Sequence, residues 1–487
     1  MSKPVGQGSG PMKIVDKFHE ECAVMGVYGH PEAANMVYLG LYALQHRGQE
    51  SCGIVSSDGN ILISHRQMGL VADVFKEDVL KRLEGASAIG HNRYSTQGQS
   101  HLKNAQPFVV EYSQGPIGIS HNGNLVNGAV LREELESSGS IFQSTSDTEV
   151  IIHLIATSKE ATLMGRIVEA LSRARGAYSL LFLTLDRMIA ARDPLGFRPL
   201  VLGKFRAGMN KGAYVVASET CALDLIEAEY IREVEPGEII TFGPEGMESL
   251  KPFPPAPHAK CIFEYIYFAR PDTNLYGHNV YQVRKALGRQ LARESAVEAD
   301  LVTPVPDSGV PAAIGFAEES GIPLEFGLIR NHYVGRTFIE PQQSIRHFGV
   351  KIKLNAQREV LQGKRVVVVD DSIVRGTTSR KIIRMLRDAG AREVHMRISS
   401  PPTVSPCYYG IDTPTRSELI ASSSSVEEIR RFIEADSLAY LSLDGMYAFF
   451  NGRREGYCDA CFSANYPVHF DDEGHTRQLQ LFEALNR

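Results

Sequence analysis

The sequence predicts two consecutive domains, an α+β domain followed by an α/β domain built on a parallel sheet. Up to about residue 250, short apolar runs cluster between glycine-rich turns, with longer helical stretches between them, which is typical of a layered α+β domain. Beyond residue 260, helical and strand patterns alternate, which favours parallel strands joined by helices. Four prolines crowd into residues 251–260, so we place the boundary after residue 252.

The expected elements follow from apolar spacing. In the first domain we predict strands over 23–27, 53–55 and 61–63, and helices over 33–44, 147–155 and 165–174. In the second we predict strands over 301–304, 365–369 and 393–398, and helices over 281–296, 309–319 and 379–389. The stretch 330–362 has no sustained period, and so long a loop in a compact domain is either a lid or a disordered insert.

Composition excludes several classes of protein. The formal net charge is −6, which argues against a general nucleic-acid binder. No run approaches the roughly 18 apolar residues of a membrane span, and residues 1–21 lack the apolar core of a secretory signal. The seven cysteines are an odd number scattered over a long chain, unlike a secreted disulfide framework. We therefore expect a soluble, cytoplasmic protein.

The sharpest local motif follows the valine run 366–369. Asp370 and Asp371 end the expected strand, and a loop of Ser, Gly and Thr over 372–379 opens the next helix. Backbone N–H groups at a helix N-terminus favour a phosphate, and paired carboxylates can accept hydrogen bonds from ribose hydroxyls. The loop lacks the glycine spacing of a Walker A or dinucleotide motif. The alternative is an ordinary turn with a capping Ser or Thr.

A second loop, over residues 304–311, also lies between a strand and a helix. Its sequence contains Asp307, Ser308 and Gly309 among three prolines. Backbone donors here could meet an anion. The alternative is a proline-fixed turn in which the aspartate caps the helix.

Polar motifs in the first domain supply the parts of an amide-hydrolysis site. The thiolate of Cys22 is a candidate nucleophile. The Asn122 amide and the Gly123 N–H could form an oxyanion hole. Arg93 could bind a carboxylate through its fork, and Asp147 could bind an ammonium group. The alternative is a buried structural cysteine with unrelated polar loops.

No obvious base accompanies this cysteine. An α-amino group, with a pKa of about 7.7–8, could take the thiol proton if Cys22 were the first residue of the mature chain.

The remaining cysteines divide into two groups. Cys52 and Cys221 lie in apolar segments, where small buried thiols are common. The other four are Cys261, Cys407, Cys458 and Cys461. The last two have a spacing that suits two thiolates on one metal. From spacing alone, a zinc site, an iron–sulfur cluster, a redox pair and unrelated thiols all remain open.

Taken together, these motifs resemble the amidophosphoribosyltransferase family, and in particular its iron–sulfur, propeptide-bearing branch. Matching stretches also occur at 193–200, 217–221 and 264–272, and the resemblance extends from residue 22 to about residue 466. It implies a propeptide over 1–21, a class II glutamine amidotransferase domain over 22–252 with the αββα sandwich of N-terminal-nucleophile hydrolases, and a type I phosphoribosyltransferase domain over 253–487 with a C-terminal helical, cluster-binding segment.

The resemblance also implies an activity, the first committed step of de novo purine biosynthesis. Glutamine hydrolysis would supply ammonia, which displaces pyrophosphate from Mg-bound phosphoribosyl pyrophosphate (PRPP) to give 5-phosphoribosylamine, glutamate and pyrophosphate. Purine nucleotides would act as feedback inhibitors, and the enzyme would be a homotetramer.

The same resemblance assigns roles to residues. Cys22 would be the nucleophile, Asn122 and Gly123 the oxyanion hole, Arg93 and Asp147 the glutamine ligands, and Arg47 a supporting residue. PRPP would be bound by Asp307, Ser308, Gly309, Lys353, Asp370, Asp371, Ser372, Arg375, Gly376, Thr377 and Thr378. One Mg²⁺ per subunit would be held by Ser308, Asp370 and Asp371, and a [4Fe–4S] cluster by Cys261, Cys407, Cys458 and Cys461. Apart from the resemblance, we interpret residues 330–354 as a candidate lid and channel wall, in which Lys351 and Lys353 could reach the pyrophosphate. The alternative is an exposed flexible loop with solvated basic residues.

Three other classes of protein share part of this pattern. Asparagine and glucosamine-phosphate synthases share the first domain, but they need a different second half, and the loop after Asp370 speaks against them. A PRPP-sensing regulator would have no reason to carry Cys22 together with Arg93 and Asn122. A cytosolic iron–sulfur sensor would explain the cysteines but neither active site.

Overall fold

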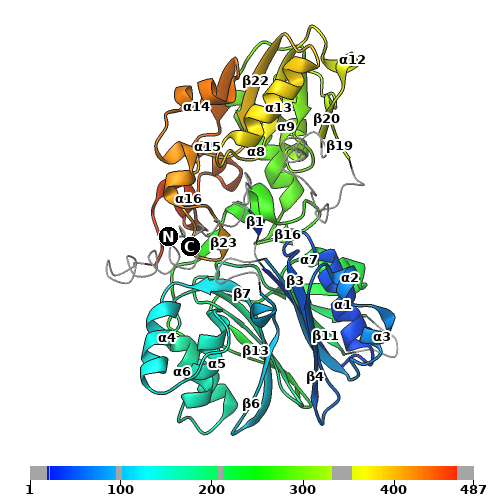
Figure 1. Ribbon diagram of the computed structural model, residues 1–487, viewed down its shortest axis with the longest axis vertical. Coiled ribbons are helices and arrows are strands. Elements are labelled where there is room, and N and C mark those ends of the chain that lie inside the picture. The colour runs from blue at the N-terminus through cyan, green and yellow to red at the C-terminus, as the bar shows by residue number, and fades with distance from the viewer. Residues whose placement is uncertain (1–18, 21, 95–100, 207–211, 332–353, 469–487) are drawn as a thin grey trace, which may run out of the picture.

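The computed structural model describes residues 19–20, 22–94, 101–206, 212–331 and 354–468. Two halves are stacked along the long axis of the molecule (Figure 1). Within the described ranges, no helix has the length and apolar character needed to cross a membrane.

The first half contains two antiparallel sheets. The seven-stranded sheet has the order β12-β10-β11-β2-β5-β3-β4. Its strands are β2 (Cys22–Tyr28), β3 (Ser51–Ser57), β4 (Leu62–Met68), β5 (Ser87–Arg93), β10 (Val201–Phe205), β11 (Tyr214–Ala217) and β12 (Ala228–Glu233). The six-stranded sheet has the order β14-β13-β9-β8-β7-β6. Its strands are β6 (Phe108–Tyr112), β7 (Gly115–Leu125), β8 (Gly176–Leu183), β9 (Met188–Arg192), β13 (Ile239–Gly243) and β14 (Gly246–Leu250).

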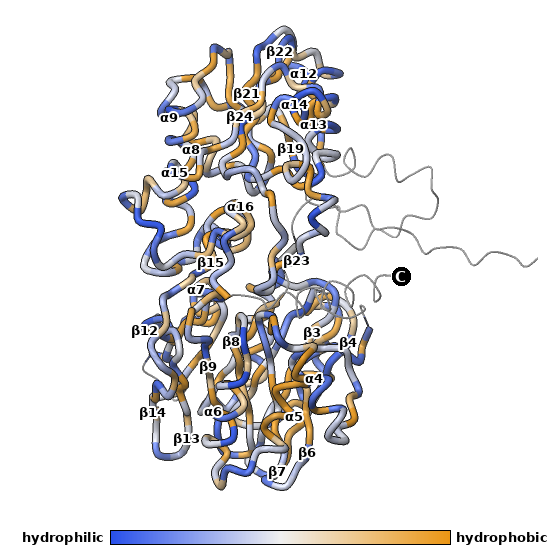
Figure 2. Tube along the Cα trace, turned by 90° about the vertical axis from the view of Figure 1, so that its left-hand side faces the viewer, coloured by the Kyte–Doolittle hydropathy of each residue, from blue (hydrophilic) through white to orange (hydrophobic). Residues whose placement is uncertain are grey.

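Helices cover the outer face of each sheet. The seven-stranded sheet carries α1 (Ala33–Ala43), α2 (Val71–Val74), α3 (Glu77–Leu80) and α7 (Thr220–Leu225), and the six-stranded sheet carries α4 (Gly128–Ser137), α5 (Thr148–Thr157) and α6 (Leu163–Arg173). Between the sheets, Val24 and Ile89 of one pack with Leu181 and Phe242 of the other. Apolar segments run along this sandwich and along α5 (Figure 2). The predicted αββα architecture is confirmed.

The second half is built on a four-stranded parallel sheet, order β18-β21-β22-β24. Its strands are β18 (Leu301–Pro304), β21 (Arg365–Asp370), β22 (Glu393–Ile398) and β24 (Ser437–Tyr440). One face packs against α8 (Val280–Glu294) and α9 (Val310–Ser320), and the other against α13 (Thr377–Asp388) and α14 (Val426–Ile433). Strand β21 is buried on both faces, which explains its unbroken valine run. The predicted parallel sheet is confirmed.

Short elements connect the two halves. Residues 251–258 form neither helix nor strand. Strand β15 (Ala259–Cys261) then pairs in parallel with β25 (Gly456–Cys458), which is followed by α16 (Ala460–Ser463). Strand β1 (His19–Glu20) pairs with β23 (Ile411–Asp412). The other small elements are η1 (Leu102–Asn104), η2 (Glu264–Phe268), β16 (Asn274–Leu275), β17 (His278–Asn279), α12 (Arg358–Leu361), η3 (Arg416–Glu418), η4 (Ile420–Ser422), α15 (Leu443–Met446) and η5 (Ala448–Phe450).

The helices and strands predicted from the sequence are present, with ends that shift by a few residues. The largest shift is in β4, predicted over 61–63, which continues to Met68 because it pairs along its whole length with β3. For the predicted lid, β19 (Leu328–Arg330) pairs antiparallel with β20 (Leu354–Ala356), so the two ends of this segment are adjacent. Residues 332–353, including Lys351 and Lys353, lie outside the described residues.

Candidate functional site

The start of β2 brings Cys22 next to Arg93. The two residues are direct partners in the antiparallel β2–β5 pair, and both side chains are buried. Side chains directly opposite on antiparallel strands are near neighbours. The predicted nucleophile and the predicted carboxylate ligand therefore lie at one end of the same sheet.

The predicted oxyanion residues lie on β7, in the facing sheet. Asn122 Nδ2 donates a long hydrogen bond of 3.5 Å to Ser218 Oγ, which also accepts a hydrogen bond from Val24 N at 3.0 Å. Ser218 therefore connects Asn122 to β2, two residues beyond Cys22. Gly123 has φ of +149°, and a Cβ there would lie 2.1 Å from the Ala177 carbonyl oxygen, so only glycine fits.

Asp147 precedes α5 and is buried at the end of β7. One carboxylate oxygen accepts a hydrogen bond from Leu125 N at 2.8 Å, and the other lies 3.7 Å from His121 Nδ1. Burial raises the pKa of Asp147, but His121 and the backbone donors of Leu125 and Thr148 outweigh that effect and hold the pKa below its usual value. Asp147 is therefore negatively charged at neutral pH, as an ammonium ligand must be.

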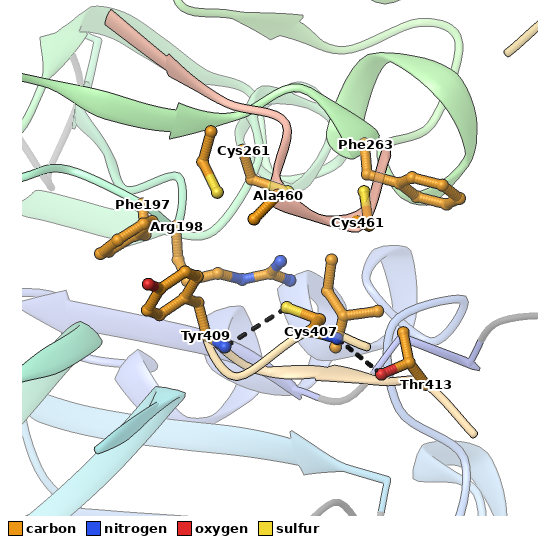
Figure 3. A pocket seen from close by; sticks show the side chains of 11 residues that line it. Phe197, Arg198, Cys261, Phe263, Cys407, Tyr409, Thr413, Ala460 and Cys461 are labelled. Atoms are coloured by element: carbon orange, nitrogen blue, oxygen red, sulfur yellow. Dashed lines mark hydrogen bonds between the residues drawn. The ribbon is translucent and has the colours of Figure 1, made fainter. Parts of the chain in front are cut away.

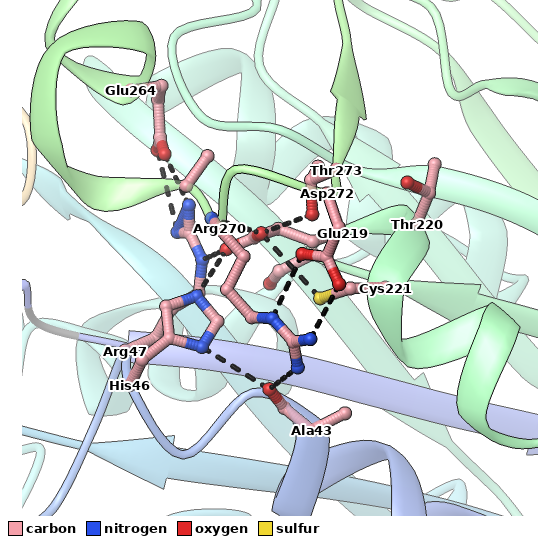
Figure 4. A network of polar contacts seen from close by, with 12 residues as sticks. Ala43, His46, Arg47, Glu219, Thr220, Cys221, Glu264, Arg270, Asp272 and Thr273 are labelled. Atoms are coloured by element: carbon pink, nitrogen blue, oxygen red, sulfur yellow. Dashed lines mark hydrogen bonds and ion pairs between the residues drawn. The ribbon is translucent and has the colours of Figure 1, made fainter. Parts of the chain in front are cut away.

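Arg47 bridges the two halves of the molecule (Figure 4). Its guanidinium pairs with Glu219 of the first half and Glu264 of the second, and all three side chains are fully buried. His46 Nε2 also lies 2.7 Å from Glu219 Oε1. Burial raises the pKa of Glu219, but Arg47 and His46 outweigh it and hold the pKa well below its usual value. Arg47, predicted only to support the site, therefore lies in a buried ion-pair network between the two halves.

The second candidate site lies at the carboxyl ends of β18 and β21, the edge where parallel sheets bind ligands. Ser308 Oγ donates a hydrogen bond of 2.5 Å to Asp371 Oδ1, and Ser372 Oγ donates one of 2.5 Å to Asp371 Oδ2. Asp370 and Asp371 are almost fully buried. The structure therefore brings together the two loops that the sequence singled out separately.

Helix α13 presents its N-terminus at this edge. Gly376, with φ of +77°, precedes Thr377 and cannot cap the helix with a side chain. The first backbone N–H groups of α13 can thus donate hydrogen bonds to a phosphate. Gly309 packs on β21 so closely that a Cβ would lie 2.4 Å from Val369 O, and Arg375 pairs with Glu418 at 2.7 Å.

Two further residues are predicted to bind PRPP. The side chain of Asp307 is 58% exposed and pairs with Arg330 at the rim of the site. Lys353 lies outside the described residues.

The four cysteines left after Cys22, Cys52 and Cys221 line one apolar cavity (Figure 3). Cys261 and Cys458 are direct partners in the β15–β25 pair, Cys461 lies in α16, and Cys407 approaches from the loop before β23. Burial raises the pKa of Cys261 to about 12, and burial also raises the pKa of Cys458 well above its usual value. Thiols in such a place become thiolates only when a metal coordinates them. All seven cysteines are free, and Cys52 and Cys221 are buried as predicted.

This donor set can be tested against the expected metals. Four thiols in apolar surroundings suit soft metals and iron–sulfur clusters. Within the described part of the chain, no three Cys, His, Asp or Glu side chains converge on a single ion. At the carboxyl ends of β18 and β21, the Ser308 hydroxyl and the carboxylates of Asp370 and Asp371 would fit a magnesium ion that keeps water and phosphate oxygens as its other ligands.

Sequence reasoning missed two contributors to these sites. Ser218 and Glu219 lie in the stretch 217–221, which carried the resemblance but no assigned role. Their positions beside Asn122 and Arg47 arise from long-range pairing, between β11 and β2 in particular, and no local spacing could reveal them.

Comparisons with known proteins agree with this geometry. Residues 91–224 match a glutamine amidotransferase domain family, and residues 274–399 match a phosphoribosyl transferase domain family. A chloroplastic amidophosphoribosyltransferase of Glycine max is 57% identical over 453 residues, which cover 93% of this chain and 79% of that protein. The amidophosphoribosyltransferase of Rhizobium etli is 52% identical over 470 residues, covering 94% of each.

A solved structure is also similar. The glutamine PRPP amidotransferase from B. subtilis, complexed with ADP and GMP, superimposes with a TM-score of 0.87 at 53% identity, covering 93% of this chain and 98% of that chain.

Proposed function

The chain belongs to the amidophosphoribosyltransferase family, and from this premise we propose how its residues carry out the reaction. The enzyme catalyses the first committed step of purine biosynthesis. Glutamine is hydrolysed to glutamate and ammonia, and the ammonia displaces pyrophosphate from PRPP to give 5-phosphoribosylamine.

In the first half-reaction, the Cys22 thiolate attacks the side-chain carboxamide of glutamine. Asn122 Nδ2 and the Gly123 N–H donate hydrogen bonds to the oxyanion that forms. Arg93 binds the α-carboxylate, and Asp147 binds the α-ammonium group. Ammonia leaves, and water then hydrolyses the glutamyl thioester. The pairing of Cys22 with Arg93 across β2 and β5 is the observation that supports this site.

The base for this step is the α-amino group of Cys22, released by cleavage after residue 21. Residues 19–20 pair with β23, so the chain just before Cys22 lies against the second half. The intact mass of the purified active enzyme tests cleavage. A mass lower by residues 1–21 is expected, and full activity in a chain that retains them would contradict it.

In the second half-reaction, Asp370 and Asp371 accept hydrogen bonds from the ribose hydroxyls, and the loop 372–378 binds the 5′-phosphate at the start of α13. Ser308, Asp370 and Asp371 would hold Mg²⁺, which when bound offsets the charge of the pyrophosphate. Pyrophosphate leaves through an oxocarbenium-like state at C1, which ammonia attacks. The Ser308–Asp371 hydrogen bond supports this assignment.

Replacing Asp371 with Asn tests this second site. It removes a buried carboxylate that serves both the ribose and the cation, so PRPP turnover should fall by at least about a hundredfold. The loss should be the same whether glutamine or ammonium supplies the nitrogen, while glutamine hydrolysis alone continues. A loss confined to the glutamine-driven rate would contradict the assignment.

We further propose a [4Fe–4S] cluster on the four cavity cysteines. When bound, the cluster would serve as a structural link, because neither half-reaction transfers electrons. The four thiols lie in β15, the loop before β23, β25 and α16, so a bound cluster would link these segments at the junction of the two halves. Iron and sulfide analysis of anaerobically purified protein tests this, and stoichiometric zinc would contradict it.

The assembly and regulation are proposed on family grounds. We expect a homotetramer, tested by light scattering, and inhibition by purine nucleotides, in line with the ADP and GMP complex of the B. subtilis relative. The free state of all seven cysteines is consistent with a cytoplasmic enzyme, whereas plant relatives are named as chloroplastic.

A further inference from the structure

A loop of the second half lies directly against β7, the strand of the first half that carries Asn122 and Gly123. Asn124, near the end of β7, donates a hydrogen bond of 2.8 Å from Nδ2 to the carbonyl oxygen of Tyr408. The ring of the next residue, Tyr409, stacks on the ring of Phe197, with the two ring centroids 4.1 Å apart (Figure 3). Residues 408–410 are therefore fixed to the glutaminase half from two sides.

Gly410 makes the closest approach in this loop. Its φ is +103°, in the region that favours glycine. A Cβ built there would lie 3.0 Å from Gly123 Cα and 3.1 Å from Gly123 C. Both neighbouring atoms belong to the backbone, so no flexible side chain could move aside to make room.

Gly123 itself has little freedom to retreat. It is paired with Tyr178 of β8, and a substituent on its Cα would lie 2.1 Å from Ala177 O. The Gly123 backbone is thus enclosed by β8 and by Gly410. Pressure from Gly410 must shift Gly123 or strain the loop that carries Gly410.

We propose that Gly410, from the phosphoribosyltransferase half, is a positioning residue for glutamine hydrolysis because it sets the place of the Gly123 N–H. This inference rests on the proposed oxyanion role of Gly123. An oxyanion donor acts on the transition state more than on bound substrate, so displacing it by a few tenths of an ångström should reduce kcat and leave KM nearly unchanged.

The test compares Gly410→Ala with Gly452→Ala. Gly452 also has a positive φ, of +75°, but among the described residues no atom beyond its two chain neighbours lies within 4 Å of a Cβ built there. The control therefore carries the backbone strain without the contact. In Gly410→Ala, we expect about a tenfold fall in kcat for glutamine-driven turnover, less than a twofold change in KM for glutamine, and an unchanged ammonium-driven rate. Gly452→Ala should keep both rates.

Other outcomes overturn the proposal. Equal loss of both rates in Gly410→Ala would show a general structural role, and full glutamine-driven activity would show that the contact has no effect. If Gly410→Ala does not fold, Asn124→Ala gives the decision, because it removes the hydrogen bond to Tyr408 without adding atoms. It should lower the glutamine-driven kcat by about threefold with the ammonium-driven rate intact, and no selective loss would reject the proposal.

A third variant separates this inference from the function on which it rests. Asn122→Ala removes an oxyanion donor directly and should lower the glutamine-driven kcat by about 10²–10³. If it does not, the oxyanion assignment itself is wrong. If it does while Gly410→Ala and Asn124→Ala behave like the original enzyme, only the positioning role fails.

Discussion

Replacing Arg47 with Met should lower the free energy of unfolding by more than the loss of an ordinary surface ion pair does. Arg47, Glu219 and Glu264 are all fully buried, and the substitution keeps the approximate length of the side chain while it removes the charge. Glu219 would keep His46, and Glu264 would keep Arg198 at 3.2 Å, but both carboxylates would lose their shared partner. Removing one member of a buried pair typically costs about 3–5 kcal/mol.

A matched control is available on the surface. Arg173 pairs with Glu134 at 2.5 Å, and their side chains are 45% and 54% exposed. Such exposed pairs contribute about 0–1 kcal/mol, so Arg173→Met should lower the free energy of unfolding by no more than that. Urea unfolding followed by circular dichroism gives the two midpoints at a common slope. A midpoint for Arg47→Met that equals the midpoint for Arg173→Met would refute the reasoning.

The double variant Arg47→Met/Glu219→Gln makes the assay sharper. If Arg47→Met destabilises the fold because it leaves Glu219 charged and unpaired, neutralising that carboxylate should restore part of the lost free energy of unfolding. The double variant should then lose less free energy of unfolding than the sum of the two single variants. Simple additivity would show that the two residues do not interact.

Two further predictions follow from the buried groups. Arg47 and His46 hold the pKa of Glu219 in the folded protein well below 4.5, so the ionised carboxylate stabilises the fold above that pH. This contribution is lost as the pH falls toward the folded-state pKa, so the difference in free energy of unfolding between the enzyme and Glu219→Gln should narrow below about pH 4.5. A difference that stays constant with pH would contradict the lowered pKa of Glu219. Replacing Cys458 with Ser should lower the amount of iron bound per subunit in anaerobically purified protein. The control Cys52→Ser changes a buried cysteine outside the cavity and should leave the bound iron unchanged. Equal iron in the two variants would exclude Cys458 as a ligand.

Much of the fold and part of each site could be predicted from local patterns in the sequence. The valine run before Asp370 and the Gly-Thr start of α13 are contiguous in the sequence, so the strand, the loop and the helix N-terminus could all be predicted. The same is true of the helical periods of α1 and α8, whose buried positions recur every three or four residues.

The long-range contacts could not be predicted from local patterns. Cys261 and Cys458 meet only because β15 and β25 pair in parallel, and the sequence alone showed a Cys-x-x-Cys pair and two isolated thiols. The approach of Gly410 to Gly123 likewise depends on how two domains pack. Residues that join separate halves carry no periodicity, because each of their partners lies in another element.

The central claim, that two active sites are joined by ammonia transfer, is tested most directly by pyrophosphate release from Mg-PRPP. Anaerobically purified enzyme should release pyrophosphate with glutamine and, separately, with ammonium salts. Cys22→Ala should lose only the glutamine-driven rate, because its phosphoribosyltransferase site is untouched. Loss of both rates in Cys22→Ala, or no release with either donor from processed protein that binds PRPP, would contradict the claim.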